Sequence, residues 1–386
     1  MFILLKNIQF FRYVIFFLLI PVGYLNPALN WAVILIGPYL IYSTPHKLSK
    51  NQNNYLLCLF LFIIIVLLTG VFSIDPQYPL KIALNILSIL LSSYFVLLRL
   101  KNKSELLIFF KAVFSATLIY VIILYWVVFD GVTFNFGESE TFGKNSSSLI
   151  IFVGLVSLLT LSLLTRKSKT ITFLSLLFFI SIFFTGSIKV VVVSALMLVY
   201  YFFFKEGIKI KKILSASVTL ILFLFAAEWY IKAAGLSDEQ SFLRITSRLS
   251  VLFGGQSEIG YIDSDYMTGY RLYLINEGLN LFYQNPISGI GLENTRHFIG
   301  TYTHNNFVEI LAGTGIFGFL IYIISLYIII KSVFKIPVYN IKAFLLFSLF
   351  CFILIANAQR IYDNRFLMVF LVSYLPLSKI LIDEKK

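Results

Sequence analysis

Residues 303–318, THNNFVEILAGTGIFG, place titratable side chains at the start of an apolar stretch. His304 comes at the beginning of a predicted helix, where the positive end of the helix dipole favours anions and keeps an imidazole neutral. A neutral imidazole can accept a proton, and Asn305 and Glu309 lie one turn apart on the same helix face. The alternative is a plain helix cap, in which Thr303 or Asn305 accepts backbone N–H groups and His304 only borders the membrane.

Glu309 falls inside the predicted apolar helix. An acid at that depth in a bilayer costs about 2–3 kcal/mol or more and is usually kept for a function. Ala312, Gly315 and Gly318 follow at a spacing of three residues, and such a small-residue face lets a neighbouring helix approach closely. We therefore interpret Glu309 as a functional residue and the small residues as a packing face.

Arginines precede this stretch and follow it. Arg271 offers a bidentate fork for phosphate oxygens, although an ordinary solvated arginine on a loop helix is the alternative. Several arginines lie in one long connection, residues 231–303, which is expected on the outer side of the membrane. The other connections on that side carry mainly acidic residues, so this group of arginines favours an anionic ligand. The further arginines of that loop are Arg244, Arg248 and Arg296. In the last outer loop, Arg360, Asp363 and Arg365 could pair with one another or reach the same site.

Patterns for metal or nucleotide chemistry are weak. Asp263-Ser264-Asp265 matches the D-x-D that some glycosyltransferases use to hold a metal, but the match is only three residues long. The sequence has no Gly-rich phosphate loop, no His/Cys metal spacing and no Ser-His-Asp order. We expect neither a bound metal nor a cofactor.

The composition identifies the protein class. Of 386 residues, 59% are hydrophobic and only 13% are charged, with a mean hydropathy of +0.90. A soluble protein would carry roughly twice that charged fraction. The recurring apolar runs predict an all-α polytopic membrane protein with about 12 transmembrane helices. The predicted spans run near 8–25, 28–43, 55–73, 79–98, 106–129, 147–165, 170–186, 188–204, 213–230, 306–331, 342–358 and 365–382.

Charged residues in the connections indicate the orientation. Alternate connections are basic, with residues such as Lys47, Arg99, Lys101, Arg166, Lys209 and Lys331, and those between them carry Asp75, Asp130, Glu138 and Glu140. Positive residues mark the cytoplasmic side, so both termini are expected inside the cell. The net charge of +13 is spread over several short loops, which argues against a nucleic-acid partner.

The connection between the ninth and tenth spans, residues 231–303, is long and lies on the outer side. A loop of that length usually has its own structure and a function. A helix is predicted from Thr268 to about Tyr283, stopped by Asn285-Pro286, with a Pro/Gly turn over 285–291. We expect a single membrane domain, 1–386, in which the outer loop 231–303 is embedded.

Spacing across the chain resembles that of a known family. His304-Asn305, nine residues and then Gly315-Ile316-Phe317-Gly318 resemble the H-N-x9-G-x-x-G element of the O-antigen ligase and O-antigen polymerase superfamily. The segment 269–291 resembles the R-x-x-x…P-x-x-G-x-G pattern that precedes this element in the family. GKNSSSLI (143–150), with Asn145, resembles an earlier Asn-containing loop, and TGSIKVVVV (185–193) resembles a T-G-S-R-like element.

The resemblance implies an activity. Members are metal-independent glycosyltransferases whose donor is a glycan on undecaprenyl diphosphate, at the outer face of the plasma membrane. The acceptor is the next lipid-linked repeat unit in polymerases and the lipid A core in ligases. By carry-over, His304 contacts the diphosphate or acts as the base, and Arg271 binds phosphate. The implied partners are the bilayer, chain-length regulators and flippases.

One departure favours a polymerase over a ligase. Ile188 stands where ligases usually carry an arginine, and the adjacent Lys189 supplies only a point charge. The residues expected to bind substrate are Asn305, Glu309, Lys189, Arg244, Arg248, Arg296, Asn145, Arg360 and Arg365. A flippase for lipid-linked oligosaccharides is the alternative from another class. It would show two related halves and charged spans, which this sequence lacks.

The predicted orientation can be tested with reporter fusions. Tags at residues 101, 168 and 209 should report the cytoplasm, and tags near residues 137 and 256 should report the outer side, because basic connections stay inside. An enzyme-fusion series measures this directly. Outer-side activity at residue 209 would reverse the orientation and with it the location of the predicted site.

Overall fold

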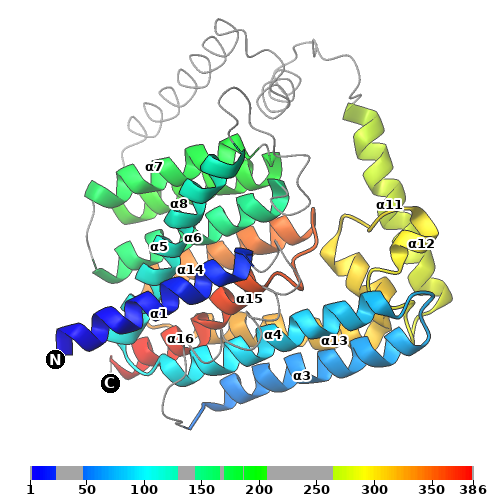
Figure 1. The fold of residues 1–386 in the computed structure, drawn as a ribbon, viewed down its shortest axis with the longest axis horizontal. Coiled ribbons are helices and arrows are strands. Elements are labelled where there is room, and N and C mark those ends of the chain that lie inside the picture. Colours follow the sequence, from blue (N-terminus) through cyan, green and yellow to red (C-terminus); the bar gives the residue numbers. More distant parts are fainter. Residues whose placement is uncertain are drawn as a thin grey trace, which may run out of the picture. The chain divides into compact units, whose positions relative to one another are not determined.

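The computed structural model describes residues 2–22, 47–128, 144–165, 169–185, 187–206 and 264–384. Their regular secondary structure is α-helical (Figure 1). The helices are α1 (Phe2–Val22), α3 (Lys50–Val71), α4 (Gln77–Arg99), α5 (Lys103–Val128), α6 (Lys144–Thr165), α7 (Lys169–Phe184), α8 (Ile188–Glu206), α11 (Ser264–Gln284), α12 (Thr295–Ile299), α13 (Asn306–Phe334), α14 (Tyr339–Ala356), α15 (Arg365–Val372) and α16 (Tyr374–Asp383).

Many of these helices have the length and composition of membrane spans. Among the described residues, 7 spans are long and apolar enough to cross a bilayer, and three shorter apolar helices accompany them. Each predicted span on described residues coincides with a helix; the last is formed by α15 and α16, which meet at Ser373. The chain is therefore a helical, multi-pass membrane protein. The spans near 28–43 and 213–230 lie outside the described residues, so the total of about twelve stays a prediction.

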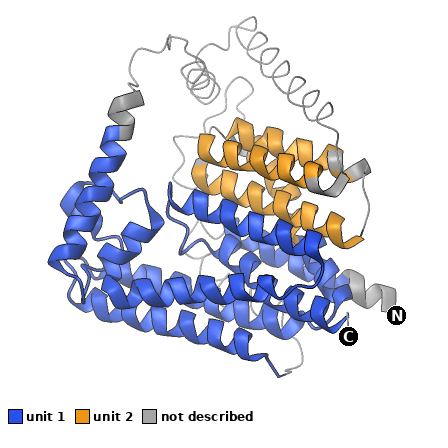
Figure 2. Cartoon of the chain, turned by 180° about the vertical axis from the view of Figure 1, so that it is seen from behind, with its two compact units in different colours: residues 1–112, 264–386 blue, residues 113–263 orange. Residues whose placement is uncertain are grey.

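The helices form two compact units (Figure 2). The first unit comprises residues 1–112 and 264–386, and the second comprises residues 113–263. The first unit holds α11 to α16, and with them most of the residues of the predicted site. The single membrane domain over 1–386 stays a prediction.

The core of the first unit joins helices to loops. Helix α3 packs against both α4 and α13. Two of the buried residues, Leu292 and Tyr362, belong to connecting segments rather than to helices. The buried cluster consists of Phe62, Ile63, Val66, Ile82, Ala83, Ile86, Leu292, Ile310, Tyr322 and Tyr362. Burial of apolar surface therefore fixes these connecting segments as well as the helices.

Helix α13 is interrupted at Gly315, and the turn over 285–291 docks into the break. Gly315 has φ 65° and ψ −169°, a conformation that is essentially restricted to glycine. Three backbone bonds join the segments: Ile290 N donates to Ala312 O (3.0 Å), Gly291 N to Gly313 O (2.9 Å) and Ile316 N to Pro286 O (2.9 Å). These bonds satisfy backbone groups near the interruption, which hydrocarbon could not do.

The small residues of α13 have two different roles. A Cβ added to Gly318 would lie 3.2 Å from the side chain of Ile65 in α3, so the predicted close helix approach is confirmed there. At Gly315 the prediction is wrong, because a Cβ would lie 2.4 Å from the backbone oxygen of Ile287. The element that approaches Gly315 is the 285–291 turn.

The second unit contains α6, α7 and α8, which pack on one another. Some of their hydroxyl side chains bond within their own helices: Thr160 donates to Val156 O (2.7 Å), and Ser194 donates to Val190 O (2.6 Å). Such local bonds let polar residues occupy apolar helices without unsatisfied donors.

Gly315→Ala tests the docked turn. We expect a large loss of stability, because the substitution adds a clash with backbone to a strain of about 1–3 kcal/mol. Gly300→Ala is the matched control, since Gly300 also has positive φ (74°) but open space around it. Thermal unfolding in detergent should show a clearly larger fall in Tm for Gly315→Ala. Equal falls would mean that the turn does not occupy the break.

Candidate functional site

His304 lies between α12 and α13, immediately before the residue that caps α13. Its backbone is left-handed, with φ 55°, which is uncommon for a residue other than glycine. Its ring centroid lies 4.1 Å from that of Tyr302, with the two ring planes inclined at 40°. Both residues are half-buried, so the imidazole borders the helix start without being enclosed.

Asn305 is the N-cap of α13. Its Oδ1 accepts from Phe307 N (2.9 Å) and Val308 N (3.1 Å), and its Nδ2 donates weakly to Asn357 (3.4 Å). The cap interpretation of Asn305 is therefore correct. Phe307 N and Val308 N therefore donate to this side chain and are not available to an anion. At this helix start an anion would still be attracted by the positive end of the helix dipole.

Both carboxyl oxygens of Glu309 accept hydrogen bonds within the protein. Its side chain is 0% exposed; Oε1 accepts from Thr295 Oγ1 (2.8 Å) and Oε2 accepts from Thr303 N (3.0 Å). Glu309 is expected to bind substrate, and in the structure it ties α12 and the segment before His304 to α13. Its partners are the buried residues Thr295, which sequence reasoning missed, and Thr303, which it considered only as a helix cap.

Asn306 binds the loop between α14 and α15 to the start of α13. Its Oδ1 accepts from Ile361 N (2.8 Å) and Tyr362 N (2.9 Å), and its Nδ2 donates to the Tyr322 hydroxyl (3.1 Å). The side chain is completely buried. Sequence reasoning missed Asn306, although the second polar residue of the His-Asn-Asn run was the available signal.

Charged side chains form a network beside α12. Glu293 pairs with Arg360, and its Oε2 lies 3.8 Å from Arg296 Nε. Arg360 Nε lies 3.2 Å from Asp363 Oδ1, so the predicted pairing of these two residues is confirmed. Glu293 is 6% exposed and has a positive φ of 64°. Arg365, the first residue of α15, is buried (1% exposed).

Arg271 lies exposed on α11 and differs from the arginines of this network. Among the residues that the structure describes, no acidic side chain forms an ion pair with it. Burial raises the pKa of the Tyr302 phenol and Glu309 raises it further, whereas the positive charges of Arg271 and Arg296 lower it. Arg271 therefore acts electrostatically on the Tyr302 phenol.

The second unit brings together two of the segments singled out in the sequence. Ser187 Oγ, just before α8, donates to Asn145 Oδ1 in the first turn of α6 (3.0 Å). Lys189 lies in the first turn of α8. Arg244, Arg248 and Asp263 lie outside the described residues.

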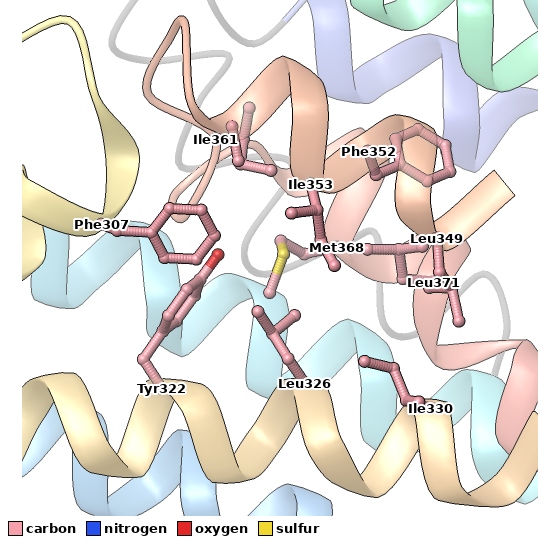
Figure 3. A pocket seen from close by; sticks show the side chains of 11 residues that line it. Phe307, Tyr322, Leu326, Ile330, Leu349, Phe352, Ile353, Ile361, Met368 and Leu371 are labelled. Carbon is pink, nitrogen blue, oxygen red and sulfur yellow. The ribbon is translucent and has the colours of Figure 1, made fainter. Parts of the chain in front are cut away.

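A small apolar cavity lies between α13, α14 and α15 (Figure 3). Its lining includes Phe307, Tyr322 and Met368, and its volume is about 20 Å³. A single water needs a cavity of about 10–15 Å³ on this measure, so no sugar or lipid chain fits. We therefore place the site at the polar segments and not in this cavity.

Asn306→Ala should destabilise the loop that follows α14. The substitution leaves two buried backbone N–H groups without an acceptor, at a cost of about 1–3 kcal/mol each. Asn280→Ala, on the exposed side of α11, is the matched control and should change stability by less than about 0.5 kcal/mol. Thermal unfolding in detergent compares the two. An Asn306→Ala protein as stable as the control would remove this bond as the anchor of the loop.

Comparison with known proteins shows that part of the chain is similar to one protein family. Comparison with curated proteins gave no match. Residues 141–323 match the family model described as O-antigen ligase. The matched range contains α11, α12, the first part of α13, and with them Arg271, Tyr302 and His304. Over residues 141–323, the match thus confirms the resemblance of this chain to the O-antigen polymerase and ligase superfamily.

Proposed function

We propose that this chain is a polysaccharide polymerase of the plasma membrane. It transfers a glycan from undecaprenyl diphosphate to an incoming lipid-linked repeat unit on the outer face. The family match supports a glycosyltransferase-like activity. The observation that carries the proposal is the placement of Arg271, an exposed cation with no acidic partner among the described residues, near Tyr302 and His304.

The reaction places one demand on the protein, which is to stabilise a leaving diphosphate. The oxygen of the acceptor hydroxyl attacks the anomeric carbon, and the bond from that carbon to the diphosphate oxygen breaks. The electron pair leaves with the diphosphate, and His304 accepts the proton of the hydroxyl. Arg271 binds the diphosphate through its guanidinium fork, and the start of α13 adds the positive field of the helix.

Arg271 suits this role better than Arg296 or Arg360. The network beside α12 contains two arginines and two acids, Glu293 and Asp363, so its charges cancel. A neutral network attracts a diphosphate weakly and serves instead to hold the loops together. Among the described residues no acid pairs with Arg271 in this way, so we propose that its positive charge is available to an anion.

Lys189 is the reason to prefer a polymerase. It stands beside Ile188 at the start of α8, where the resemblance places an arginine in ligases. We propose that Lys189, with Asn145, contributes to substrate binding as a point charge without a fork. The second candidate is an O-antigen ligase that transfers the glycan to the lipid A core, which the description of the matched family favours.

The proposed site also implies where the protein acts and with what. We place both termini in the cytoplasm and the loop 231–303 on the outer side, where lipid-linked glycan is displayed. Chain-length regulators and flippases are the proposed protein partners. Arg244 and Arg248 stay candidates for binding the anionic donor.

Arg271→Lys is the sharpest single test. It keeps the charge and removes the fork, and loss of bidentate binding to a diphosphate should reduce the rate by roughly a hundredfold. His304→Ala should abolish transfer while the protein still accumulates. The measurement is chain elongation on purified lipid-linked repeat units, with a chelator present throughout.

Arg99→Lys, at the far end of α4, is the matched control and should elongate like the wild type. Near-normal elongation by Arg271→Lys would remove Arg271 from the site. Loss of wild-type activity on chelation would instead favour Asp263 and Asp265 as metal ligands.

A further inference from the structure

Tyr302 lies two residues before His304, in the segment between α12 and α13. Its ring lies 4.1 Å from that of His304, measured between centroids. Its phenol is influenced by charges from three helices: Arg271 of α11, Arg296 of α12 and Glu309 of α13. The adjacent residue, Thr303, is held by Glu309 and by Asn305, so the chain between the two rings is fixed on both sides.

Because the backbone of His304 is left-handed, the contact between its imidazole and the Tyr302 ring matters for the orientation of the imidazole. A left-handed residue in a connecting segment has no helix or strand to fix its side chain, and its conformation must be maintained by its surroundings. The Tyr302 ring is one such contact of the imidazole. An aromatic face also stabilises a neighbouring cation and therefore the protonated imidazole.

We propose that Tyr302 is a positioning residue for His304, and that its ring holds the imidazole in the orientation in which it accepts the proton of the acceptor hydroxyl. This inference rests on the proposed function. It assigns the role to the aromatic ring of Tyr302, and the phenolic oxygen makes no contact with the reacting atoms.

The test compares substitutions that keep or remove the ring. Tyr302→Phe should elongate within about threefold of the wild type, because it retains the aromatic face. Tyr302→Leu should fall at least tenfold in kcat with KM for the lipid-linked donor nearly unchanged, since the ring does not touch substrate. Tyr302→Met, a flexible apolar residue, replaces Leu if that variant accumulates poorly.

The pH dependence of the rate separates positioning from a general loss of folded protein. If the ring stabilises the imidazolium, its removal moves the acid limb of the pH–rate profile to lower pH. Tyr302→Phe should leave the limb in place. A variant with less folded protein would lower the rate at every pH and would not move the limb.

Each other outcome overturns the proposal. Equal losses in Tyr302→Phe and Tyr302→Leu would assign the role to the hydroxyl and to direct contact with substrate. Full activity of Tyr302→Leu would show that His304 needs no support from this ring. Absence of elongation by the wild type would instead refute the proposed function, whatever the substitutions do.

Discussion

A carboxyl group buried in an apolar helix is stable only when hydrogen-bond donors surround it. The donors of Glu309 therefore determine where α12 and the segment before α13 lie. One oxygen is bonded by Thr295 of α12, and the other is bonded by the backbone of Thr303, next to His304. Water cannot replace these donors because the side chain is completely buried. The position of His304 relative to α13 therefore follows from the need to satisfy one acid.

The same logic extends to the neighbouring segments. Asn306 satisfies the backbone of the last loop, and the break at Gly315 receives the backbone of the 285–291 turn. In each case a polar group of α13 is bonded by a segment distant in sequence. These connecting segments of the first unit are thus held against α13 by hydrogen bonds, and the neutral network around Glu293 adds ion pairs to them.

Much of the helical architecture could be predicted, because hydropathy reports each span separately. Helix α11 and its end at Gln284 also followed from local signals, the Asn285-Pro286 pair above all. The roles of Asn306 and Gly315 could not be predicted, because they depend on partners far along the chain. The partners of Asn306, for instance, are 55 and 56 residues away. Glu293 was missed for the same reason, since an isolated acid shows no pattern until Arg360 is placed beside it.

We propose that Arg271 and His304 together transfer glycan from a lipid diphosphate. Reconstitution of the purified protein in liposomes with lipid-linked repeat units alone tests it most directly. The quantity to measure is free undecaprenyl diphosphate against glycosidic bonds formed. The account predicts one lipid diphosphate released for each repeat unit joined, without any lipid A core. Release only after lipid A core is added, or no release at all, would contradict it.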